Sequence, residues 1–256
     1  MEVPYDNITG ARYERQLWMK SIQTSGQEKL TQASVLIIGA GGLGSSASYY
    51  LTAAGVGTIG IADYDTIETS NLNRQILYST SDLGYLKADT ARKKLLDLNP
   101  GLRINSHVIK VDTTNIVSLA SSYDLILDAS DNYPTRYLIN DYCVKENKAL
   151  FFGSVSAWSG IFFAWIPLKN QACFRCLYPI PLAEDLASKE RTSGIIGVSP
   201  GLIGSIMASQ AIQYIVHQSF GLENRFLWID LEKGVFTSYQ SKINLECSSC
   251  HHPSAL

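Results

Sequence analysis

Short apolar runs alternate along this chain with longer segments that mix apolar and polar residues at helical spacing. Residues Ser34–Ile38 are nearly all apolar and precede a glycine, which predicts a buried strand, and residues 13–30 before them have a loosely helical pattern. Small residues dominate 45–51 and favour close packing of a helix on a sheet. A second strand is predicted over 57–62, so the segments from 34 to 62 form a strand, helix and strand unit.

The same alternation continues toward the C-terminus. It predicts helices over 88–98, 133–146 and 202–217, and strands over 102–109, 124–128, 149–155, 161–166, 226–230 and 235–239. Only a short segment rich in small residues separates strands 149–155 and 161–166, which suits a turn rather than a crossover helix. We therefore expect an α/β fold with a Rossmann-like, doubly wound sheet, parallel in its N-terminal half and mixed or antiparallel in its C-terminal half.

Size and composition fit one large domain. The chain has 256 residues, 46% of them hydrophobic, so we expect 1–256 to form a single domain with flexible ends at 1–10 and 251–256. Its 21 Lys and Arg against 23 Asp and Glu lack the basic excess of a general nucleic-acid binder. No apolar stretch is long enough to span a bilayer and the first residues do not resemble a signal peptide, so we expect a cytoplasmic protein without membrane contact. Only 17% of the residues are charged, which favours a surface partly covered by a second copy in a homodimer.

A glycine motif, Gly39-x-Gly41-x-x-Gly44, lies between the first predicted strand and its helix. Such a turn lets the backbone approach a phosphate closely and points N–H groups of the helix start at the anion. Asp63, at the end of the second strand, would accept hydrogen bonds from ribose hydroxyls. The motif favours a nucleotide-binding site over a purely structural turn, but it does not distinguish between ATP, NAD and flavin as the ligand.

The residues after Asp63 favour a triphosphate. Arg74 and Gln75 put a guanidinium and an amide at the phosphate end, and Lys87 adds a positive charge near a helix start. Such donors stabilise the negative charge that develops during substitution at phosphorus, and hydride transfer does not need them. A solvated arginine and lysine on a loop is the alternative.

Asp131 and Asn132 follow the strand that ends at Asp128, where side chains face the ligand crevice of a doubly wound sheet. Asp131 could hold a magnesium ion that bridges ATP phosphates. A second, compatible role is the N-cap of the helix that begins near Tyr133.

Four of the five cysteines form two C-x-x-C pairs, Cys173 with Cys176 and Cys247 with Cys250. This spacing is typical of a tetrahedral zinc site, and disulfides are disfavoured in a cytosolic chain. Four cysteine ligands leave no open coordination position, so the predicted Zn²⁺ is structural. Cys143, inside a predicted helix, is expected to be a small core residue.

A set of motifs occurs here in the order found in one family: Arg12-Tyr13-x-Arg15-Gln16, the glycine motif, Ser70-Asn71-Leu72-x-Arg74-Gln75, Gly84-x-x-Lys87, Leu98-Asn99-Pro100, Asp128-x-x-Asp131-Asn132-x-x-x-Arg136 and the two C-x-x-C pairs. Over roughly residues 10–250 the chain resembles the ThiF/MoeB/HesA adenylyltransferases, bacterial relatives of ubiquitin-activating enzymes, and most of all their thiazole-pathway branch. The resemblance implies ATP-dependent activation of the C-terminal glycine carboxylate of a small ubiquitin-like sulfur-carrier protein. The product is an acyl adenylate, pyrophosphate is released, and the pathway is thiamine or molybdopterin biosynthesis.

Carried over position by position, the resemblance also implies the roles of individual residues. It assigns catalysis to Arg15, Arg74, Lys87 and Asp131, with Arg15 contributed by the other subunit of the homodimer and Asp131 binding Mg²⁺. It places ATP on Gly39, Gly41, Gly42, Gly44, Asp63, Asp65, Asn71, Arg74, Gln75, Lys87, Asp131 and Asn132.

One position departs from the thiazole-pathway branch, whose members carry a cysteine where this chain has Glu190. A carboxylate cannot form a persulfide-derived acyl link. We therefore expect adenylation without covalent transfer to this chain, with sulfur delivered by a separate cysteine desulfurase or rhodanese-type protein. We expect the charged segment 182–193 to be mobile.

Other functions remain open from the sequence alone. The same adenylation could act on a peptide C-terminus in peptide-antibiotic maturation, and the missing cysteine favours that alternative. A nucleotide-binding module without turnover, or an NAD-dependent oxidoreductase, would also fit the glycine motif taken by itself.

Overall fold

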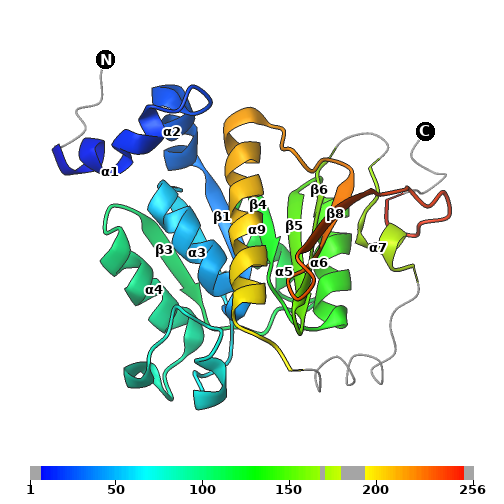
Figure 1. Ribbon diagram of the computed structural model, residues 1–256, viewed down its shortest axis with the longest axis horizontal. Coiled ribbons are helices and arrows are strands. Elements are labelled where there is room, and N and C mark those ends of the chain that lie inside the picture. The colour runs from blue at the N-terminus through cyan, green and yellow to red at the C-terminus, as the bar shows by residue number, and fades with distance from the viewer. Residues whose placement is uncertain (1–6, 168–170, 180–193, 251–256) are drawn as a thin grey trace.

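The computed structural model describes residues 7–167, 171–179 and 194–250. These residues form one eight-stranded sheet with the strand order β3-β2-β1-β4-β5-β6-β7-β8 (Figure 1). The strands are β1 Ser34–Ile38, β2 Thr58–Ala62, β3 Arg103–His107, β4 Leu125–Asp128, β5 Ala149–Ser156, β6 Ser159–Trp165, β7 Arg225–Asp230 and β8 Val235–Gln240. Strands β1 to β5 are parallel, and β5 to β8 pair antiparallel. The predicted change from a parallel to an antiparallel half is confirmed.

The predicted helices lie close to their expected ranges except near the N-terminus, and two short helices of five and four residues were not predicted. The helices are α1 Asn7–Leu17, α2 Gln23–Gln32, α3 Gly42–Ala54, α4 Lys87–Leu98, α5 Ile116–Ala120, α6 Tyr133–Lys145, α7 Phe174–Leu177 and α9 Val198–His217, with short 3-10 turns at η1 Thr69–Asn71 and η2 Thr80–Asp82. The helical pattern over 13–30 is two helices, because the chain turns between them and Gln23 adopts φ +53°. α1 begins at Asn7, inside the segment expected to be flexible, while 1–6 and 251–256 lie outside the described residues.

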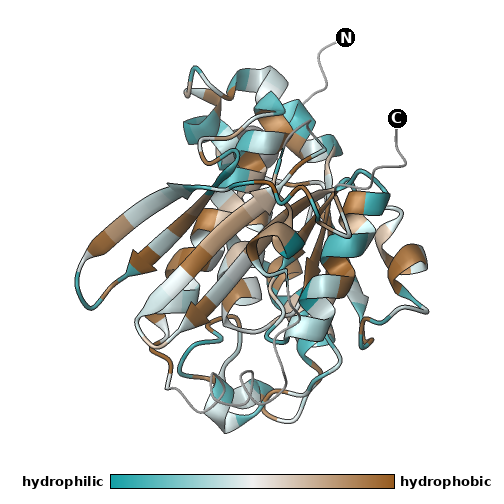
Figure 2. Cartoon of the chain, turned by 90° about the vertical axis from the view of Figure 1, so that its right-hand side faces the viewer, coloured by the Kyte–Doolittle hydropathy of each residue, from teal (hydrophilic) through white to brown (hydrophobic). Residues whose placement is uncertain are grey.

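The sheet is covered on both faces, so its central strands are apolar on both sides. Val35 and Ile37 of β1 belong to one core cluster, shared with α3, α4 and α9, whereas Leu36 and Ile38 belong to the other, shared with α5 and α6. Figure 2 shows hydrophobic residues along the strands and a mixture of hydrophobic and hydrophilic residues on the helices around them. No helix in the described part of the chain is long and apolar enough to cross a membrane.

Close packing of α3 against α9 depends on small residues. A Cβ on Gly204 of α9 would lie 2.4 Å from the carbonyl oxygen of Leu43, so only glycine fits there. The Ser46 hydroxyl lies 3.2 Å from the carbonyl oxygen of Pro200 and joins the two helices. The small residues over 45–51 therefore allow a close approach to α9 as well as to the sheet.

Candidate functional site

The glycine motif lies at the point where the sheet connections diverge. β1 pairs with β2 on one side and with β4 on the other, so its carboxyl end is the position at which doubly wound sheets have their ligand crevice. Gly39 has φ +98°, and a Cβ on it would lie 2.6 Å from the Ala129 carbonyl oxygen at the end of β4. A Cβ on Gly44 would lie 2.0 Å from the Gly39 carbonyl oxygen. Both positions therefore require glycine, and the turn is as tight as the motif predicts.

The start of α3 has no side-chain cap. Gly42 is the first residue of this helix, and Gly41 is its N-cap and carries no side chain that could accept from the free N–H groups. A Cβ on Gly41 would lie 3.7 Å from Gln75 Nε2, and one on Gly42 would lie 2.9 Å from the Pro200 ring. The uncapped N–H groups at this helix start can donate to an anion such as a phosphate.

Asp63 connects the end of β2 to the glycine turn. Its Oδ2 accepts a hydrogen bond from the Ala40 backbone N at 2.7 Å, and its Oδ1 accepts from the Asp65 backbone N at 2.9 Å. Burial raises the pKa of this carboxyl, and the two backbone donors oppose the rise. The carboxylate keeps further lone pairs for a hydroxyl ligand.

Lys87 begins α4 beside the same turn. Its Nζ lies 2.9 Å from Asp65 Oδ2, and its side chain is 7% exposed. The Tyr78 hydroxyl lies 3.0 Å from the Ala40 carbonyl oxygen and 3.1 Å from that of Lys87, so it joins the glycine turn to the start of α4. Tyr78 was not predicted as a site residue, because nothing in the sequence separates it from an ordinary core tyrosine.

The segment with Asn71, Arg74 and Gln75 packs against the glycine turn. Asn71 is buried, and its Oδ1 accepts from the Glu68 backbone N at 3.2 Å. The Arg74 guanidinium donates to the Ser70 carbonyl oxygen at 2.7 Å, within its own turn. Gln75 is buried with its Oε1 unbonded and its Nε2 close to Gly41. The Gln75 side chain therefore lies beside Gly41, whereas the Asn71 and Arg74 side chains bond within their own segment.

The loop after β4 completes this edge of the sheet. The predicted capping role of Asp131 is wrong: Asn132 is the N-cap of α6, and its Oδ1 accepts from the Thr135 backbone N at 3.0 Å. The side-chain oxygen of Asn132, one residue after Asp131, is the one that reaches the free N–H group of Thr135. Asp131 itself is exposed and has no hydrogen bond among the described residues. Asp131 is thus an open carboxylate, and hard oxygen donors of this kind are what Mg²⁺ prefers.

A buried clamp supports the loop that carries Asp131. Oδ1 of the fully buried Asp128 accepts from the Ser130 backbone N at 3.0 Å and from its hydroxyl at 2.6 Å. Arg136 Nη2 donates to the Ser130 carbonyl oxygen at 3.1 Å. Burial raises the pKa of Asp128, and the nearby Arg136 charge opposes the rise. Ser130 was missed in the sequence, although it lies between the two charged residues of the motif.

Arg15 is far from these residues within one chain. Gln16, the next residue of α1, donates to the Ala54 carbonyl oxygen at the C-terminus of α3, whereas the glycine turn lies at the N-terminus of α3. The 13 residues of α3 separate the two by roughly 20 Å. Figure 1 shows α1 near the upper end of α3. The structure therefore does not bring Arg15 to the other candidate residues of the same chain.

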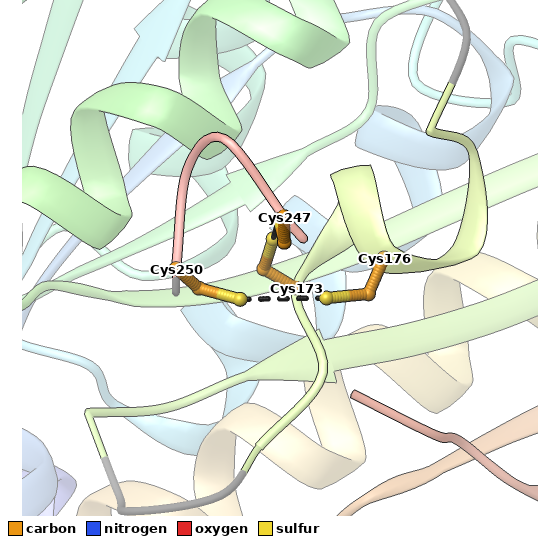
Figure 3. Close-up of side chains that lie close together, drawn as sticks. All are labelled: Cys173, Cys176, Cys247 and Cys250. Carbon is orange, nitrogen blue, oxygen red and sulfur yellow. Dashed lines mark hydrogen bonds between the residues drawn. The ribbon is translucent and has the colours of Figure 1, made fainter. Parts of the chain in front are cut away.

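The four cysteines of the two C-x-x-C pairs come together, although the pairs are far apart in sequence. Their Sγ atoms all lie within 4.8 Å of one another, and Figure 3 shows the sulfurs turned toward a common centre. Four sulfurs about 2.3 Å from one ion in a tetrahedron are separated by about 3.8 Å. The separations of 3.6 Å between Cys173 and Cys247 and 3.4 Å between Cys176 and Cys250 are close to this value. Soft thiolate donors in this number fit zinc.

Cys143 is a core residue, as predicted. Its side chain is fully buried on α6, and burial raises the pKa of its thiol. A buried thiol that stays protonated is not a nucleophile. Glu190 and the whole segment 182–193, which we expect to be mobile, lie outside the described residues.

Comparisons with known proteins agree with this geometry. The model of the ThiF family matches residues 13–249. The chain is 38% identical over 243 residues to the sulfur carrier protein adenylyltransferase of Thermus thermophilus, covering 93% of this chain and 90% of that protein. It is 41% identical over 245 residues to adenylyltransferase and sulfurtransferase MOCS3 of Drosophila yakuba, covering 96% of this chain and 53% of MOCS3, so it spans about half of that relative.

Solved structures share the fold at lower identity. The crystal structure of E. coli MccB with ATP matches with a TM-score of 0.82 and 24% identity over 93% of this chain and 74% of MccB. MccB with the peptide MccA-N7isoASN matches with a TM-score of 0.82 and 23% identity over 97% of this chain and 76% of MccB. At this identity, the likeness concerns the fold alone.

Proposed function

Because the chain belongs to the ThiF family, we propose that it is an ATP-dependent adenylyltransferase for a small ubiquitin-like sulfur-carrier protein. The observation that carries the proposal is the similarity, over nearly the full length of both chains, to the sulfur carrier protein adenylyltransferase of Thermus thermophilus. The arrangement of glycine turn, Asp63, Lys87 and Asp131 around one crevice supports it.

The reaction is a substitution at phosphorus. An oxygen of the carrier's terminal carboxylate forms a bond to the α-phosphorus of ATP, the bond from that phosphorus to the bridging oxygen breaks, and pyrophosphate leaves with the electron pair. The products are an acyl adenylate and pyrophosphate. The carboxylate is already ionised near pH 7, so no general base is required. The site's task is to position two anions and to stabilise the charge that spreads over the phosphates.

Each residue of the crevice has a role in this scheme. The N–H groups at the start of α3 and the backbone of Gly41 and Gly42 hold the phosphates, and Asp63 accepts from the ribose hydroxyls. Arg74 and Lys87 donate to the phosphates, with Asp65, Asn71, Gln75 and Asn132 lining the same site. Asp131 would hold Mg²⁺, which supplies positive charge at the phosphate oxygens when bound. The four clustered cysteines would hold Zn²⁺ as a structural ion.

An exposed apolar surface beside the crevice supports a protein substrate. It consists of Trp158, Ile196, Val198, Val235 and Phe236. The Trp158 carbonyl oxygen accepts from the Leu231 backbone N between β7 and β8, which brings the turn after β5 next to the last hairpin. A Cβ on Gly197 would lie 2.3 Å from the Asn73 carbonyl oxygen, so this surface reaches the phosphate-binding segment. A carrier that packs on it could extend its tail toward the crevice.

The position of α1 supports a homodimer in which Arg15 acts in the site of the partner subunit. Met19 and Tyr50 are exposed and line a groove of about 610 Å³ between the loop after α1 and the helices α3 and α9. A second copy seated against this apolar face would bury it. Catalysis would then require the dimer.

We place sulfur transfer on another protein. Cys143 is buried, and the family's cysteine position holds Glu190, so this chain adenylates the carrier without forming a covalent link to it. A separate cysteine desulfurase or rhodanese-type protein then delivers sulfur to the acyl adenylate. The setting is thiamine or molybdopterin biosynthesis in the cytoplasm.

ATP–pyrophosphate exchange tests the proposal. Purified zinc-loaded protein should incorporate labelled pyrophosphate into ATP only when a carrier with a Gly-Gly tail is present. Exchange with a short peptide and not with carriers would favour activation of a peptide C-terminus instead. Absence of exchange with every di-glycine-tailed carrier, or tighter binding of NAD than of ATP in calorimetry, would refute it. After turnover, mass spectrometry of the intact chain should show no added carrier.

A further inference from the structure

Asn140 of α6 connects the two C-x-x-C turns. This side chain is fully buried, and its Oδ1 accepts a hydrogen bond from the backbone N of Phe174, the residue after Cys173, at 2.8 Å. Its Nδ2 lies 3.3 Å from the hydroxyl of Ser249, the residue before Cys250. One carboxamide thus bonds to both turns, and nothing in the adenylation chemistry requires it.

We propose that Asn140 is a positioning residue for the metal, which holds the two C-x-x-C turns at the separation that a tetrahedral four-cysteine site needs. The inference rests on the proposal that the cysteines hold zinc. The remaining amide hydrogen of Asn140 has a partner too, because Nδ2 also lies 3.1 Å from Asp141 Oδ1. A carboxamide with three of its bonds satisfied has little freedom to turn, so it fixes the positions of its partners.

Tyr137 and Asp141 of α6 contact the first turn. The Tyr137 ring packs edge-on against the Phe174 ring at 5.2 Å between centroids. Asp141 receives two hydrogen bonds of 2.6 Å from the Arg175 guanidinium. These contacts attach the first turn to the helix, whereas Asn140 adds the bond to Ser249 of the second turn.

The physical need for such a bridge is clear. The first and second turns belong to segments separated by 70 residues, and four thiolates brought together repel one another until the ion is bound. Groups behind the ligands that fix ligand orientation typically contribute 10–100-fold to metal affinity. Asn140 bonds to a backbone N–H group of the first turn and to a hydroxyl of the second. The two turns are therefore already ordered relative to each other, and metal binding costs less conformational entropy.

The test measures the metal and not the adenylation reaction. Zinc-loaded full-length chain is mixed with excess chromophoric chelator, and the release rate is followed by absorbance. Asn140→Leu should release zinc about 10–100-fold faster than the unchanged protein. Ile139→Val, which shortens a fully buried side chain on the same helix, is the matched control and should leave the release rate unchanged.

Two further variants keep the test decisive if Asn140→Leu does not fold. Ser249→Ala removes only the acceptor on the second turn and should accelerate release in the same direction, by a smaller factor. Asn140→Asp keeps the acceptor for Phe174, loses the donor to Ser249 and adds a negative charge near the thiolates, so it should accelerate release more than Ser249→Ala.

The cobalt-substituted protein separates this inference from the zinc proposal. Tetrahedral thiolate ligation of Co²⁺ gives intense charge-transfer and visible bands. Without these bands in the unchanged protein, both the zinc proposal and this inference fail, and adenylation is unaffected. With the bands present, release at the unchanged rate from the folded variants Asn140→Asp and Ser249→Ala would overturn the role of Asn140 alone.

Discussion

Lys87 and Asp65 contact each other twice. The Lys87 ammonium lies 2.9 Å from Asp65 Oδ2, and the Lys87 backbone N donates to the Asp65 carbonyl oxygen, also at 2.9 Å. The lysine side chain is 7% exposed and the aspartate side chain 50%. Asp65 therefore holds a buried positive charge at the start of α4, next to the glycine turn. Such an arrangement reduces the cost of positioning the charge when a triphosphate binds.

Replacing Lys87 by methionine should lower the rate of ATP–pyrophosphate exchange about 100–1000-fold, or about 3–4 kcal/mol of transition-state stabilisation. The physical reason is the loss of one preorganised donor to the phosphates. Lys94 offers a matched control, since it lies on the same helix and pairs with Asp82 at 2.8 Å, away from the crevice. Lys94→Met should keep nearly full exchange. If both variants lost the same exchange activity, the cause would be a change in the helix and not the loss of a donor to the phosphates.

Mixing two inactive variants tests whether Arg15 acts across a dimer. Arg15→Ala and Lys87→Met should each be inactive alone, while co-refolded mixtures should regain exchange. Each mixed dimer then contains one site with both an intact Lys87 and an intact partner's Arg15. Random pairing predicts about a quarter of the unchanged activity, because half the dimers are mixed and each has one working site. If the mixture stays inactive although mixed dimers form, Arg15 does not act in this way.

Much of the fold follows from local pattern. Residues 35–38 of β1 are apolar on both faces because helices cover both sides of the sheet, and a single glycine after them marks the turn. The short turn between β5 and β6 excludes a crossover, so the antiparallel pairing was predictable. The break between α1 and α2 was not, because it depends on a left-handed Gln23 that the periodicity does not reveal. The five-residue helix α5 is too short to show a period.

The candidate site was predictable where one motif supplies it and not where partners come from distant segments. The glycine turn and the four cysteines follow from spacing alone. The hydroxyl of Tyr78 and the carboxamide of Asn140 bond to groups many residues away, and their local sequence resembles that of any core position. The capping role went to Asn132 and not to Asp131 because a shift of one residue decides which oxygen reaches the Thr135 N–H. The exact residue at which a helix begins depends on tertiary packing, which the local sequence does not show.

His107 should make stability depend on pH. Burial lowers its pKa below the ordinary value of 6.5, since the imidazolium is poorly solvated there, and its Nε2 lies 2.8 Å from the Tyr123 hydroxyl. Below about pH 6.5 the unfolded chain binds the proton more readily, so the free energy of unfolding should fall as the pH falls through the folded-state pKa. His107→Gln keeps a polar partner for Tyr123 and should flatten the profile between pH 7 and 5 in urea unfolding.

A comparison of variants is needed because Asp63 and Asp128 act in the opposite sense. Burial raises both of their pKa values above the ordinary 3.8, so acidification through the raised values favours the folded chain at these two groups. A His107→Gln profile as steep as that of the unchanged protein would contradict the role of His107.

Ser130 should contribute to stability and to binding of the metal-bound nucleotide at the same time. Its hydroxyl donates at 2.6 Å to Asp128 Oδ1, while Asp128 Oδ2 has no partner among the described residues. Ser130→Ala therefore leaves a buried carboxyl with one donor fewer, which should cost about 1.5–3 kcal/mol in the free energy of unfolding. The loop that carries Ser130 and Asp131 packs closely on the glycine turn, because a Cβ on Gly39 would lie 3.1 Å from the Ser130 backbone N. We expect the KM for magnesium-bound ATP to rise in this variant while exchange at saturating ATP changes less.

A control for Ser130→Ala is Ser48→Ala, which removes a buried hydroxyl that donates to the Ser45 carbonyl oxygen within its own helix, at 3.1 Å. No charge loses a donor there, so the cost in stability should be smaller and the KM unchanged. Urea unfolding and initial exchange rates over a range of ATP concentrations distinguish the two effects. If Ser130→Ala lowered stability without raising the KM, the clamp between Asp128 and Arg136 would support the fold only. If Ser130→Ala raised the KM and Ser48→Ala did not, Ser130 would connect Asp128 to nucleotide binding. The Asp128 carboxyl would then affect the nucleotide although it is buried away from the solvent.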